Sequence, residues 1–552
     1  MSRRTKIAMA AIIVLGGLLR FYALDRIPSG IYPDEAINGV EGLEAAETGQ
    51  FKLFYPTNNG REGLWINLVG FAVRAFGNNH FSLRFWAALF GAVTVWGSGL
   101  LAWKLFSSVR IGLLAAFFVA TSFWHLNFSR IAFSGILVPL LMVWSFYFLL
   151  NAWDRPKAKA GAAYAILGGV LFGLGFHTYS PFRFAPFVWI VLFALMYLQR
   201  RKIGATLRPF LISTAFWLGA AFVAALPIGI YFWTHPEDFS GRANMVSIFA
   251  TDAPLQTFKQ VLVQTLGMFN IHGDCNWRHN MSCSPQLILP VGLAFLVGIG
   301  RGVGSIVRRA GRSKKIAGKR PTRNRAVSKS KESNLVPSPA PMEAKLVSYF
   351  LFAWTVFLLA PELLTFEGIP HALRSIGVIP PVLMLAAFGA DAIYEKVKGI
   401  PFLRVTLLII VAGSGIVEAY RYFGVWAVNI DTIAIDAFLK PDVEIVRYLK
   451  SHPPATPKYV VVNVVDPVMV PHKNPDGSTK LFPWDVQTVI YLTLKDPSVT
   501  YLALEDFVNY VFPQGSVIVP YARNPEVFRF LRQKGMKISE QEFPYFTAGI
   551  VE

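Results

Sequence analysis

Charged residues are scarce in this chain of 552 residues. Asp, Glu, Lys and Arg together make up 16% of the sequence, whereas an average soluble domain contains about a quarter. Apolar residues make up 54%, and the mean hydropathy is +0.44. This composition excludes an ordinary soluble globular protein and predicts a polytopic α-helical membrane protein, because backbone groups in lipid must satisfy their own hydrogen bonds.

A signal-peptide cleavage site is missing after the first apolar run, residues 7–24. The run follows the basic start "MSRRTK" and continues into "RFYALDR", which lacks the small residues of a cleavage site. We therefore expect a retained span whose N-terminus is cytoplasmic. Ten further runs approach the roughly 20 residues that cross a bilayer. The eleven predicted spans lie near residues 7–24, 82–105, 110–128, 131–151, 161–179, 182–199, 207–233, 286–306, 346–366, 371–392 and 402–422.

Acidic residues are outnumbered, 33 against 53 basic ones, which gives a formal net charge of +20. Much of the excess lies within residues 307–345, a Pro-, Ser- and Lys-rich segment without apolar periodicity, which we expect to be a disordered cytoplasmic loop. Attraction to anionic lipid head groups explains such a segment, so nucleic acid is not an expected partner. The other basic loops alternate with neutral ones, which predicts that residues 25–80, 234–285 and the C-terminal segment lie outside a cell membrane.

Cysteine is nearly absent: the only two, Cys275 and Cys283, both occur in "HGDCNWRHNMSC". This segment is predicted to lie outside, where disulfides persist, so we expect the two cysteines to be joined. The alternative is a metal site with His272, Asp274 and His279, whose spacing fits no standard zinc pattern. We therefore predict no metal site and no cofactor, although a divalent metal ion is left open as a non-essential component.

The character of the sequence changes near residue 425, which divides a membrane domain, 1–425, from a second domain, 426–552. In the second domain "VEIVRYLKSH" and "NPEVFRFLRQKG" have helical patterns, whereas "KYVVVNVV" and "GSVIVPYA" are typical of strands. This alternation predicts a small extracytoplasmic α/β domain. It contains no phosphate-loop or catalytic-triad motif, so we expect structural support or acceptor recognition.

The first outside loop, residues 25–80, begins with two adjacent carboxylates, Asp34 and Glu35. A helix is predicted from there to about residue 48, where Gly49 can end it. A second helix is predicted in "REGLWINLVGFAVRAFG", with one apolar stripe made of Leu64, Trp65, Leu68, Val69, Ala72, Ala75 and Phe76. Both are too short to span, so we expect them to lie along the membrane surface. An acidic residue at a helix start is also an ordinary N-cap, which is the alternative role for Asp34.

Short motifs in this organisation resemble the GT-C class of membrane glycosyltransferases, in particular the protein O-mannosyltransferases and the bacterial aminoarabinose transferases of lipid A. The motifs are "YPDEA", "NGREGLWINLVGFAVRAFG", "HFSLRFWAALFGA", "FHTYSPFRFAP" and "EGIPHALRSIGVIPP". The resemblance implies transfer of a sugar, with inversion, from a polyprenyl-phosphate donor to an extracytoplasmic protein, lipid or glycan. It also implies that Asp34 is the catalytic base and Glu35 its acidic neighbour.

Further substrate-binding residues are predicted, two from the resemblance and the others from the chemistry of the reaction. Glu62 resembles a glutamate that the aminoarabinose transferases place before "KPP", but here Gly63 and Leu64 follow, so Arg61 is the candidate to replace the lysine. Cations are needed to hold a departing phosphate. Three arginines at the outer ends of predicted spans are candidates, with two neighbours that complete a predicted substrate-binding set: Arg130, Arg183, Arg374, His371 and Tyr179. Their alternative role is to reach head groups or to pair with a carboxylate.

Two other classes of protein fit a polytopic chain with interfacial charges. One is a transporter or flippase for lipid-linked sugars, and the other is a non-catalytic binder of such lipids with the same fold. Transporters of this kind often contain inverted repeats, and the two halves of this sequence show no similarity. The long first loop and the outside domain favour an enzyme that acts on a bulky acceptor.

Overall fold

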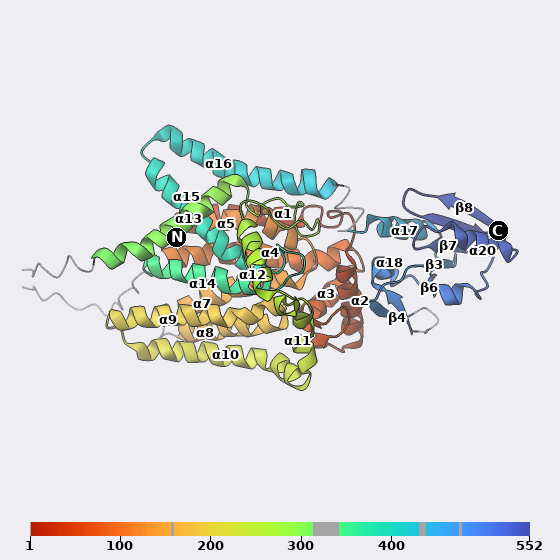
Figure 1. Cartoon of the computed structure of the whole chain (residues 1–552), viewed down its shortest axis with the longest axis horizontal. Helices are drawn as coiled ribbons and strands as arrows, with labels where there is room; N and C mark the ends of the chain where they lie inside the picture. Colours follow the sequence, from red (N-terminus) through yellow and green to blue (C-terminus); the bar gives the residue numbers. More distant parts are fainter. Residues whose placement is uncertain (1, 156–158, 313–341, 430–437, 474–476, 478) are drawn as a thin grey trace, which may run out of the picture.

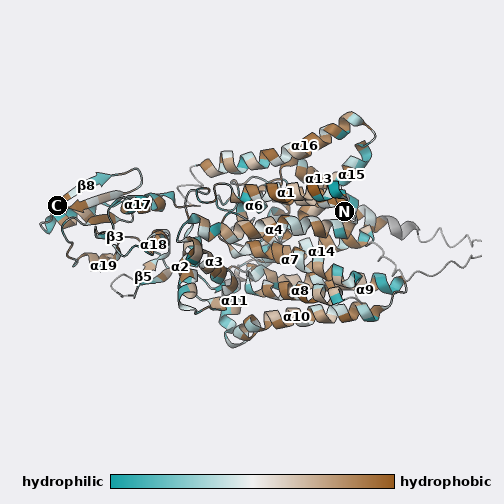
Figure 2. Cartoon of the chain, turned by 180° about the vertical axis from the view of Figure 1, so that it is seen from behind, coloured by the Kyte–Doolittle hydropathy of each residue, from teal (hydrophilic) through white to brown (hydrophobic). Residues whose placement is uncertain are grey.

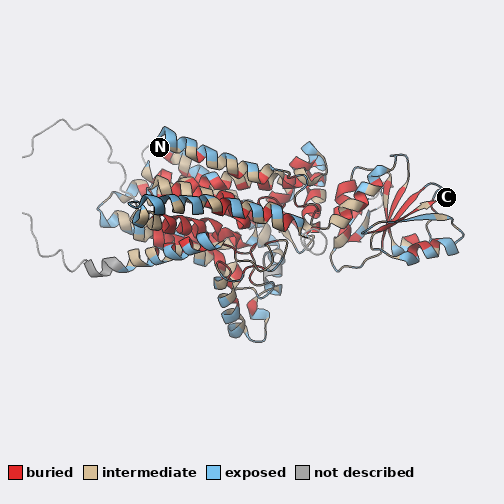
Figure 3. Ribbon diagram, turned by 90° about the horizontal axis from the view of Figure 1, so that it is seen from above, coloured by how far each residue is buried: buried red, intermediate tan, exposed pale blue. Residues whose placement is uncertain are grey.

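The computed structural model describes residues 2–155, 159–312, 342–429, 438–473, 477 and 479–552. A helical bundle makes up most of the molecule, and a small domain with a sheet lies beyond one end of it (Figure 1). Hydrophobic residues cover the outer helices of the bundle (Figure 2), and buried residues fill its interior (Figure 3). Most of the predicted basic loop, residues 313–341, lies outside the described residues.

In the part of the chain that the structure describes, nine helices are long and apolar enough to cross a membrane, and the protein is a multi-pass membrane protein. They are α4 (His80–Phe106), α7 (Leu137–Asp154), α8 (Lys159–Leu174), α9 (Ala185–Lys202), α10 (Leu207–Thr234), α13 (Leu289–Arg312), α14 (Ala344–Leu363), α15 (Ile379–Val397) and α16 (Pro401–Tyr420), some with a short 3₁₀ turn added at one end.

The predicted count of eleven spans is not confirmed, because two of the predicted spans are not among these nine helices. The first corresponds to α1 (Arg3–Phe21), which carries four basic residues. One of them, Arg20, is buried and donates to the carbonyls of Val119 and Ala120. The second corresponds to α5 (Val109–Thr121), whose 13 residues reach only about 20 Å. It ends at Ser122, where the separate helix α6 (Phe123–Phe128) begins.

Both helices predicted in the first outside loop are present, as α2 (Pro33–Thr48) and α3 (Gly63–Phe76). They lie across the end of the bundle, between it and the small domain (Figure 1). Pro33 begins α2, and Gly49 ends it with a left-handed φ of 74° that a side chain would strain. Two short strands, β1 (Phe54–Tyr55) and β2 (Arg61–Glu62), pair between the two helices.

The predicted apolar stripe of α3 is divided between the protein interior and its surface. Trp65, Val69 and Ala72 are buried, together with Ile66 and Val73 from outside the stripe, whereas Phe76 is exposed. The cause is close packing against α2 on a second side of the helix. A Cβ on Gly70 would lie 1.9 Å from the carbonyl oxygen of Gly42, so only glycine allows the two backbones to approach this closely.

Two further short helices lie in the segment between α10 and α13. They are α11 (Pro236–Met245) and α12 (Pro254–Gly267), and both begin with a proline in the first turn, where the missing N–H costs nothing.

The C-terminal domain is a mixed sheet with helices. Its strands β3 (Lys458–Val462), β6 (Val499–Ala503), β7 (Val517–Pro520), β8 (Ile538–Glu542) and β9 (Thr547–Val551) have the order β6-β3-β7-β9-β8, with β3 parallel to β6 and β7. A separate hairpin joins β4 (Met469–Lys473) to β5 (Thr479–Pro483). The helices are α17 (Lys440–Ser451), α18 (Gln487–Thr493), α19 (Leu504–Phe507) and α20 (Pro525–Gln533). The predicted strands and helices of the small α/β domain are therefore present.

The arrangement of the ends agrees with the charge pattern of the sequence. The N-terminus, the basic α9–α10 connection and the basic α15–α16 connection lie at the end of the bundle opposite to the C-terminal domain (Figure 1). Basic loops gather on the cytoplasmic side of membrane proteins. Which end faces the cytoplasm stays a prediction from the sequence.

We expect a cysteine introduced at Val465 to react with a membrane-impermeant maleimide on intact cells, and a cysteine at Ser328 to react only after the cells are permeabilised. Val465 is 96% exposed in the C-terminal domain, and Ser328 belongs to the basic segment. The native cysteines are joined and need not be removed. Labelling of Ser328→Cys from outside would reverse the orientation.

Candidate active site

A cavity of about 410 Å³ opens where the first predicted outside loop, residues 25–80, meets the end of the bundle nearest the C-terminal domain. Its wall contains seven of the nine side chains predicted to bind or act on substrate. These are Asp34, Arg61, Glu62, Tyr179, Arg183, His371 and Arg374. The structure thus brings together residues from α2, from β2 and from the segments that connect α8 to α9 and α14 to α15. The other two predicted residues, Glu35 and Arg130, are not part of this wall.

Asp34 occupies the first turn of α2, and its two carboxylate oxygens differ. Oδ1 accepts hydrogen bonds from Asn58 Nδ2 at 2.7 Å and from Trp484 Nε1 at 2.9 Å. Oδ2 has no hydrogen-bond partner among the described residues, so it is the oxygen left to accept a proton. Sequence reasoning missed Trp484, because a residue 450 positions away on another domain gives no local signal.

Glu35 is fully buried and points away from the cavity. Its carboxylate forms an ion pair with Arg84, Nε to Oε1 at 3.1 Å, and accepts the backbone N–H groups of Tyr32 and Ala132. Neither oxygen is left to contact a substrate. The predicted catalytic role of Glu35 therefore does not fit its position, and its contacts hold the start of α2 against the bundle.

Arg130 is also fully buried, which corrects its predicted role in substrate binding. Its Nη1 donates to the carbonyls of Leu19 and Arg20 at 2.8 and 2.7 Å, and its Nη2 donates to those of Tyr22 and Ile27 at 2.8 and 3.0 Å. Its Nη groups are engaged with these carbonyl oxygens, and its remaining donor, Nε, is buried, so the guanidinium is not accessible to a phosphate. Arg130 instead closes the turn that follows α1.

Three cavity arginines have carboxylate partners. Arg183 pairs with Glu62 at 3.3 Å, Arg374 pairs with Glu367 at 3.3 Å, and Arg61 pairs with Glu41. Arg183 also lies over the ring of Phe239, 4.1 Å from its centroid. Such pairs hold the guanidinium groups in place and compete with an incoming anion for the same N–H donors.

Arg278 is the fourth arginine of the cavity wall, and it differs from the other three. Within the described chain it makes no ion pair with a carboxylate. Its guanidinium lies over the ring of Tyr32, 4.0 Å from the centroid, and its Nε donates to His279 Nε2 at 3.1 Å. Sequence reasoning treated the surrounding segment only as a disulfide or metal candidate and so missed this arginine.

A buried relay orients Arg278. A carboxylate can only accept, so His279 donates from Nδ1 to Asp274 Oδ2, at 3.0 Å, and its Nε2 accepts from Arg278. Asp274 is held in turn by the backbone N–H groups of Asn276 and Ala372. The chain of contacts fixes the guanidinium at the cavity wall.

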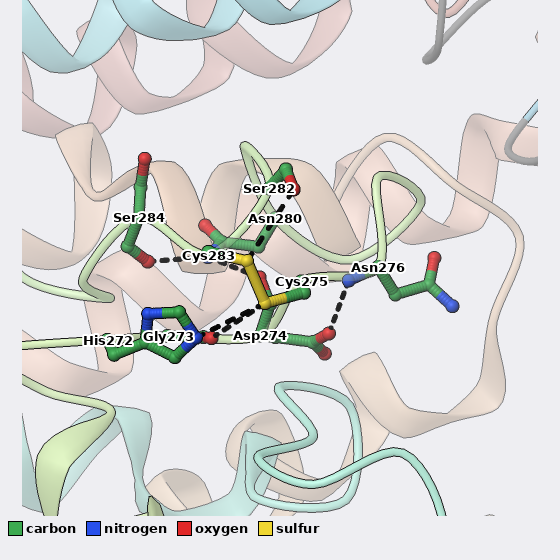
Figure 4. The surroundings of a disulfide bond; sticks show 9 residues. All are labelled: His272, Gly273, Asp274, Cys275, Asn276, Asn280, Ser282, Cys283 and Ser284. Carbon is green, nitrogen blue, oxygen red and sulfur yellow. Dashed lines mark hydrogen bonds between the residues drawn. A yellow bond between two sulfur atoms is a disulfide. The ribbon is translucent and has the colours of Figure 1, made fainter.

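The loop that carries this relay is closed by the disulfide between Cys275 and Cys283, which confirms the predicted pairing (Figure 4). Backbone bonds reinforce the closure, since Gly273 N donates to Cys283 O and Cys283 N donates to Asp274 O. Asn280 Nδ2 donates to the carbonyls of Asp274 and Ser284 inside the loop. The loop is therefore a rigid support for Arg278.

Asp274, His279 and His371 bring possible metal-ligand atoms within 4.8 Å of one another. Burial lowers the pKa of His279 and of His371 well below the usual range, and the nearby Arg374 adds to the effect, so both imidazoles are neutral. Both nitrogens of His279 are already engaged with Asp274 and Arg278. Each of these three side chains thus has a hydrogen-bond partner within the described chain. In the other group, with His272, the joined cysteines cannot act as thiolate ligands.

Comparison with known proteins places these features in context. A family model described as dolichyl-phosphate-mannose-protein mannosyltransferase matches residues 63–231. The chain is similar to ArnT from Cupriavidus metallidurans, both bound to undecaprenyl phosphate (12% identity, TM-score 0.51) and in the apo state (14%, 0.53), over 100% of this chain and 98% of that chain. It is also similar to the oligosaccharyltransferase AglB from Archaeoglobus fulgidus in complex with an inhibitory peptide and a dolichol-phosphate (13%, 0.50), over 90% of this chain and 64% of that one.

These matches confirm the resemblance to GT-C glycosyltransferases and show an ArnT-like fold. No curated protein sequence matches the chain significantly.

We expect the paired substitutions Cys275→Ser and Cys283→Ser to lower the free energy of unfolding by about 2–3 kcal/mol, the chain-entropy contribution of a short closed loop. Thermal unfolding of both proteins in the same detergent measures the difference. Mass spectrometry of unreduced peptides is the accompanying check on the wild type, where two free thiols in freshly isolated protein would contradict the bridge.

Proposed function

We propose that this protein transfers a sugar from a polyprenyl-phosphate donor to an acceptor outside the membrane, with inversion, and that Asp34 is the general base. One observation carries the proposal: a carboxylate with one unoccupied oxygen shares a single cavity wall with four arginines. Base and cations are the two kinds of group that this reaction needs. The resemblance of the fold to that of ArnT also supports a sugar transferase.

The reaction assigns a task to each kind of group. The acceptor's hydroxyl or amine attacks the anomeric carbon of the sugar, and its proton passes to Asp34 Oδ2. The bond between that carbon and the phosphate oxygen breaks, and the electron pair leaves with the phosphate. Arginines stabilise the charge that develops on the departing oxygen. Attack opposite to the leaving group produces inversion.

Support for a lipid-phosphate donor comes from the relatives. The matched ArnT structure holds undecaprenyl phosphate, and the AglB structure holds a dolichol-phosphate and a peptide. In our proposal the donor's tail lies in the bilayer, the acceptor approaches from the side of the C-terminal domain, and the basic end of the bundle faces the cytoplasm. Transfer of radiolabelled sugar by the purified protein distinguishes this enzyme from a transporter, a flippase or a non-catalytic binder.

Among the arginines, Arg278 is the best candidate to bind the phosphate. An anion that binds Arg183 or Arg374 must compete with Glu62 or Glu367, whereas Arg278 has no carboxylate partner in the described chain. Arg183 and Arg374, which we predicted from the sequence, remain candidates for a second contact, as do Tyr179 and His371 on the same wall. Arg61 and Glu62 shape the wall from the first loop.

Replacement of Asp34 by Asn should lower the rate of transfer at least about 100-fold, the usual scale for loss of a general base. The amide oxygen of Asn can still accept from Asn58 and Trp484, so we expect the thermal stability and the binding of undecaprenyl phosphate to stay near wild type. Asp238→Asn is the matched control, because Asp238 is another acidic residue of the cavity wall and accepts from Tyr231. Near-normal transfer by Asp34→Asn would remove Asp34 from the mechanism.

Replacement of Arg278 by Ala should weaken the binding of undecaprenyl phosphate about 10-fold or more, the range for hydrogen bonds to a charged group. Lys keeps the charge but loses the planar fork, so Arg278→Lys should bind more tightly than Arg278→Ala. Ala at Arg183 or at Arg374 should have a smaller effect, because a phosphate that binds either guanidinium must first displace its carboxylate partner and so gains less from the contact. Arg404→Ala, at an exposed arginine of α16, is the control. Unchanged binding in Arg278→Ala would assign the phosphate to another residue.

A further inference from the structure

The C-terminal domain reaches the candidate base directly. Trp484 follows the last residue of β5, and its indole Nε1 donates to Asp34 Oδ1 at 2.9 Å. The indole ring also packs edge-on against Tyr32, with 5.1 Å between ring centroids. The backbone N–H of Trp484 donates to Val468 O, which ties the residue to the β4–β5 hairpin.

The domain that carries Trp484 is fixed to the first outside loop by further contacts. Thr488 Oγ1 donates to the carbonyl of Ile31 at 2.9 Å, three residues before Asp34. Tyr491 packs so closely on α2 that a Cβ on Gly39 would lie 2.5 Å from its ring. Asn78 Nδ2 donates to the carbonyl of Tyr491 at 3.0 Å. The contact between Trp484 and Asp34 is therefore part of a larger interface between the C-terminal domain and the first outside loop.

We propose that Trp484 is a positioning residue for Asp34, so that the C-terminal domain completes the active site. This inference rests on the proposed role of Asp34 as the base. Trp484 and Asn58 approach the same oxygen, Oδ1, from two different segments of the chain. Two donors on one oxygen fix the rotation of the carboxylate, and this keeps Oδ2 available for the acceptor's proton.

The loss of one donor has a specific consequence. Asn58 lies in the β1–β2 loop, in the same segment of the chain as Asp34, so it gives the carboxylate no reference outside that segment. The indole belongs to the C-terminal domain, so its hydrogen bond fixes the orientation of the carboxylate relative to that domain. Small displacements of a catalytic group reduce the rate more than the binding of substrate. We therefore expect an effect on kcat with little change in the KM for the donor.

Trp484→Phe tests the inference, since it keeps an aromatic ring beside Tyr32 but removes the N–H donor. We expect kcat to fall roughly 10-fold, the scale for one hydrogen bond to a charged group, with the donor KM changed less than twofold. Thr488→Val is the matched control, because it removes another hydrogen bond between the C-terminal domain and the first outside loop, one that does not touch Asp34. Equal losses of kcat in the two variants would show that domain docking alone matters and would overturn the inference.

Trp484→Phe also makes the side chain smaller, and incorporation of benzothienylalanine at position 484 tests the N–H group without that change. This analogue keeps the fused two-ring side chain and has sulfur in place of the N–H group, so it should reproduce the loss of kcat with a thermal stability equal to that of wild type. Wild-type kcat with the analogue would overturn the inference even if Trp484→Phe fails to fold.

A double-substituted protein separates this inference from the proposed function. If Trp484 acts only through Asp34, Trp484→Phe should cause no further loss in an Asp34→Asn background. A further loss of about 10-fold would assign Trp484 a role independent of Asp34. Near-normal transfer by Asp34→Asn itself would refute the base, whereas a low rate in Asp34→Asn together with additive losses would refute only the positioning role.

Discussion

The buried ion pair between Glu35 and Arg84 is the interaction on which the geometry of the candidate site depends. Each oxygen of Glu35 accepts two donors, one from Arg84 and one from the backbone of Tyr32 or Ala132. Arg84 also donates to the carbonyls of Pro28 and Gly30. A buried pair adds little over well-packed apolar residues, but removal of one partner strands a charge and costs about 3–5 kcal/mol. The pair therefore fixes one arrangement of the chain that leads into α2.

This anchor explains why two adjacent carboxylates have different tasks. Successive residues of a helix point about 100° apart, since 3.6 residues make one turn. Once Glu35 faces the bundle, Asp34 faces the cavity and the C-terminal domain. The sequence motif predicts a catalytic role for both. The same motif instead contains a fixed residue and a reactive candidate, and the rigidity of the first determines the position of the second.

Hydropathy and charge were enough to predict the helical bundle, the two helices of the first loop and the α/β domain, because those patterns are local. Ser122 separates α5 from α6, but a single serine hardly changes the average hydropathy of the segment, so the sequence predicts one span in place of two short helices. The burial of Arg130 depends on carbonyls from residues 19–27, which a sequence places more than 100 positions away. Trp484 and Arg278 escaped prediction for the same reason. Their roles arise from segments that only the fold brings beside Asp34.

Arginines in this protein fall into two groups that composition cannot distinguish. One group is fully buried and donates to backbone carbonyl oxygens of other segments: Arg20, Arg84 and Arg130. These arginines stabilise the packing of those segments against one another. A guanidinium suits this task because its five donors are planar and stay charged when buried.

The arginines of the cavity wall can pair either with a carboxylate of the protein or with a phosphate of the substrate. Glu62 and Glu367 neutralise Arg183 and Arg374 when no other anion is present, which lowers the cost of holding cations at the edge of a membrane. A phosphate that displaces such a carboxylate exchanges one ion pair for another and gains little. A phosphate that meets Arg278 gains a new pair, and the cation–π contact with Tyr32 keeps the guanidinium in place without occupying it with an anion. In the proposed reaction the affinity for the departing phosphate therefore comes mainly from the disulfide-closed loop, while the first outside loop and the C-terminal domain hold the base.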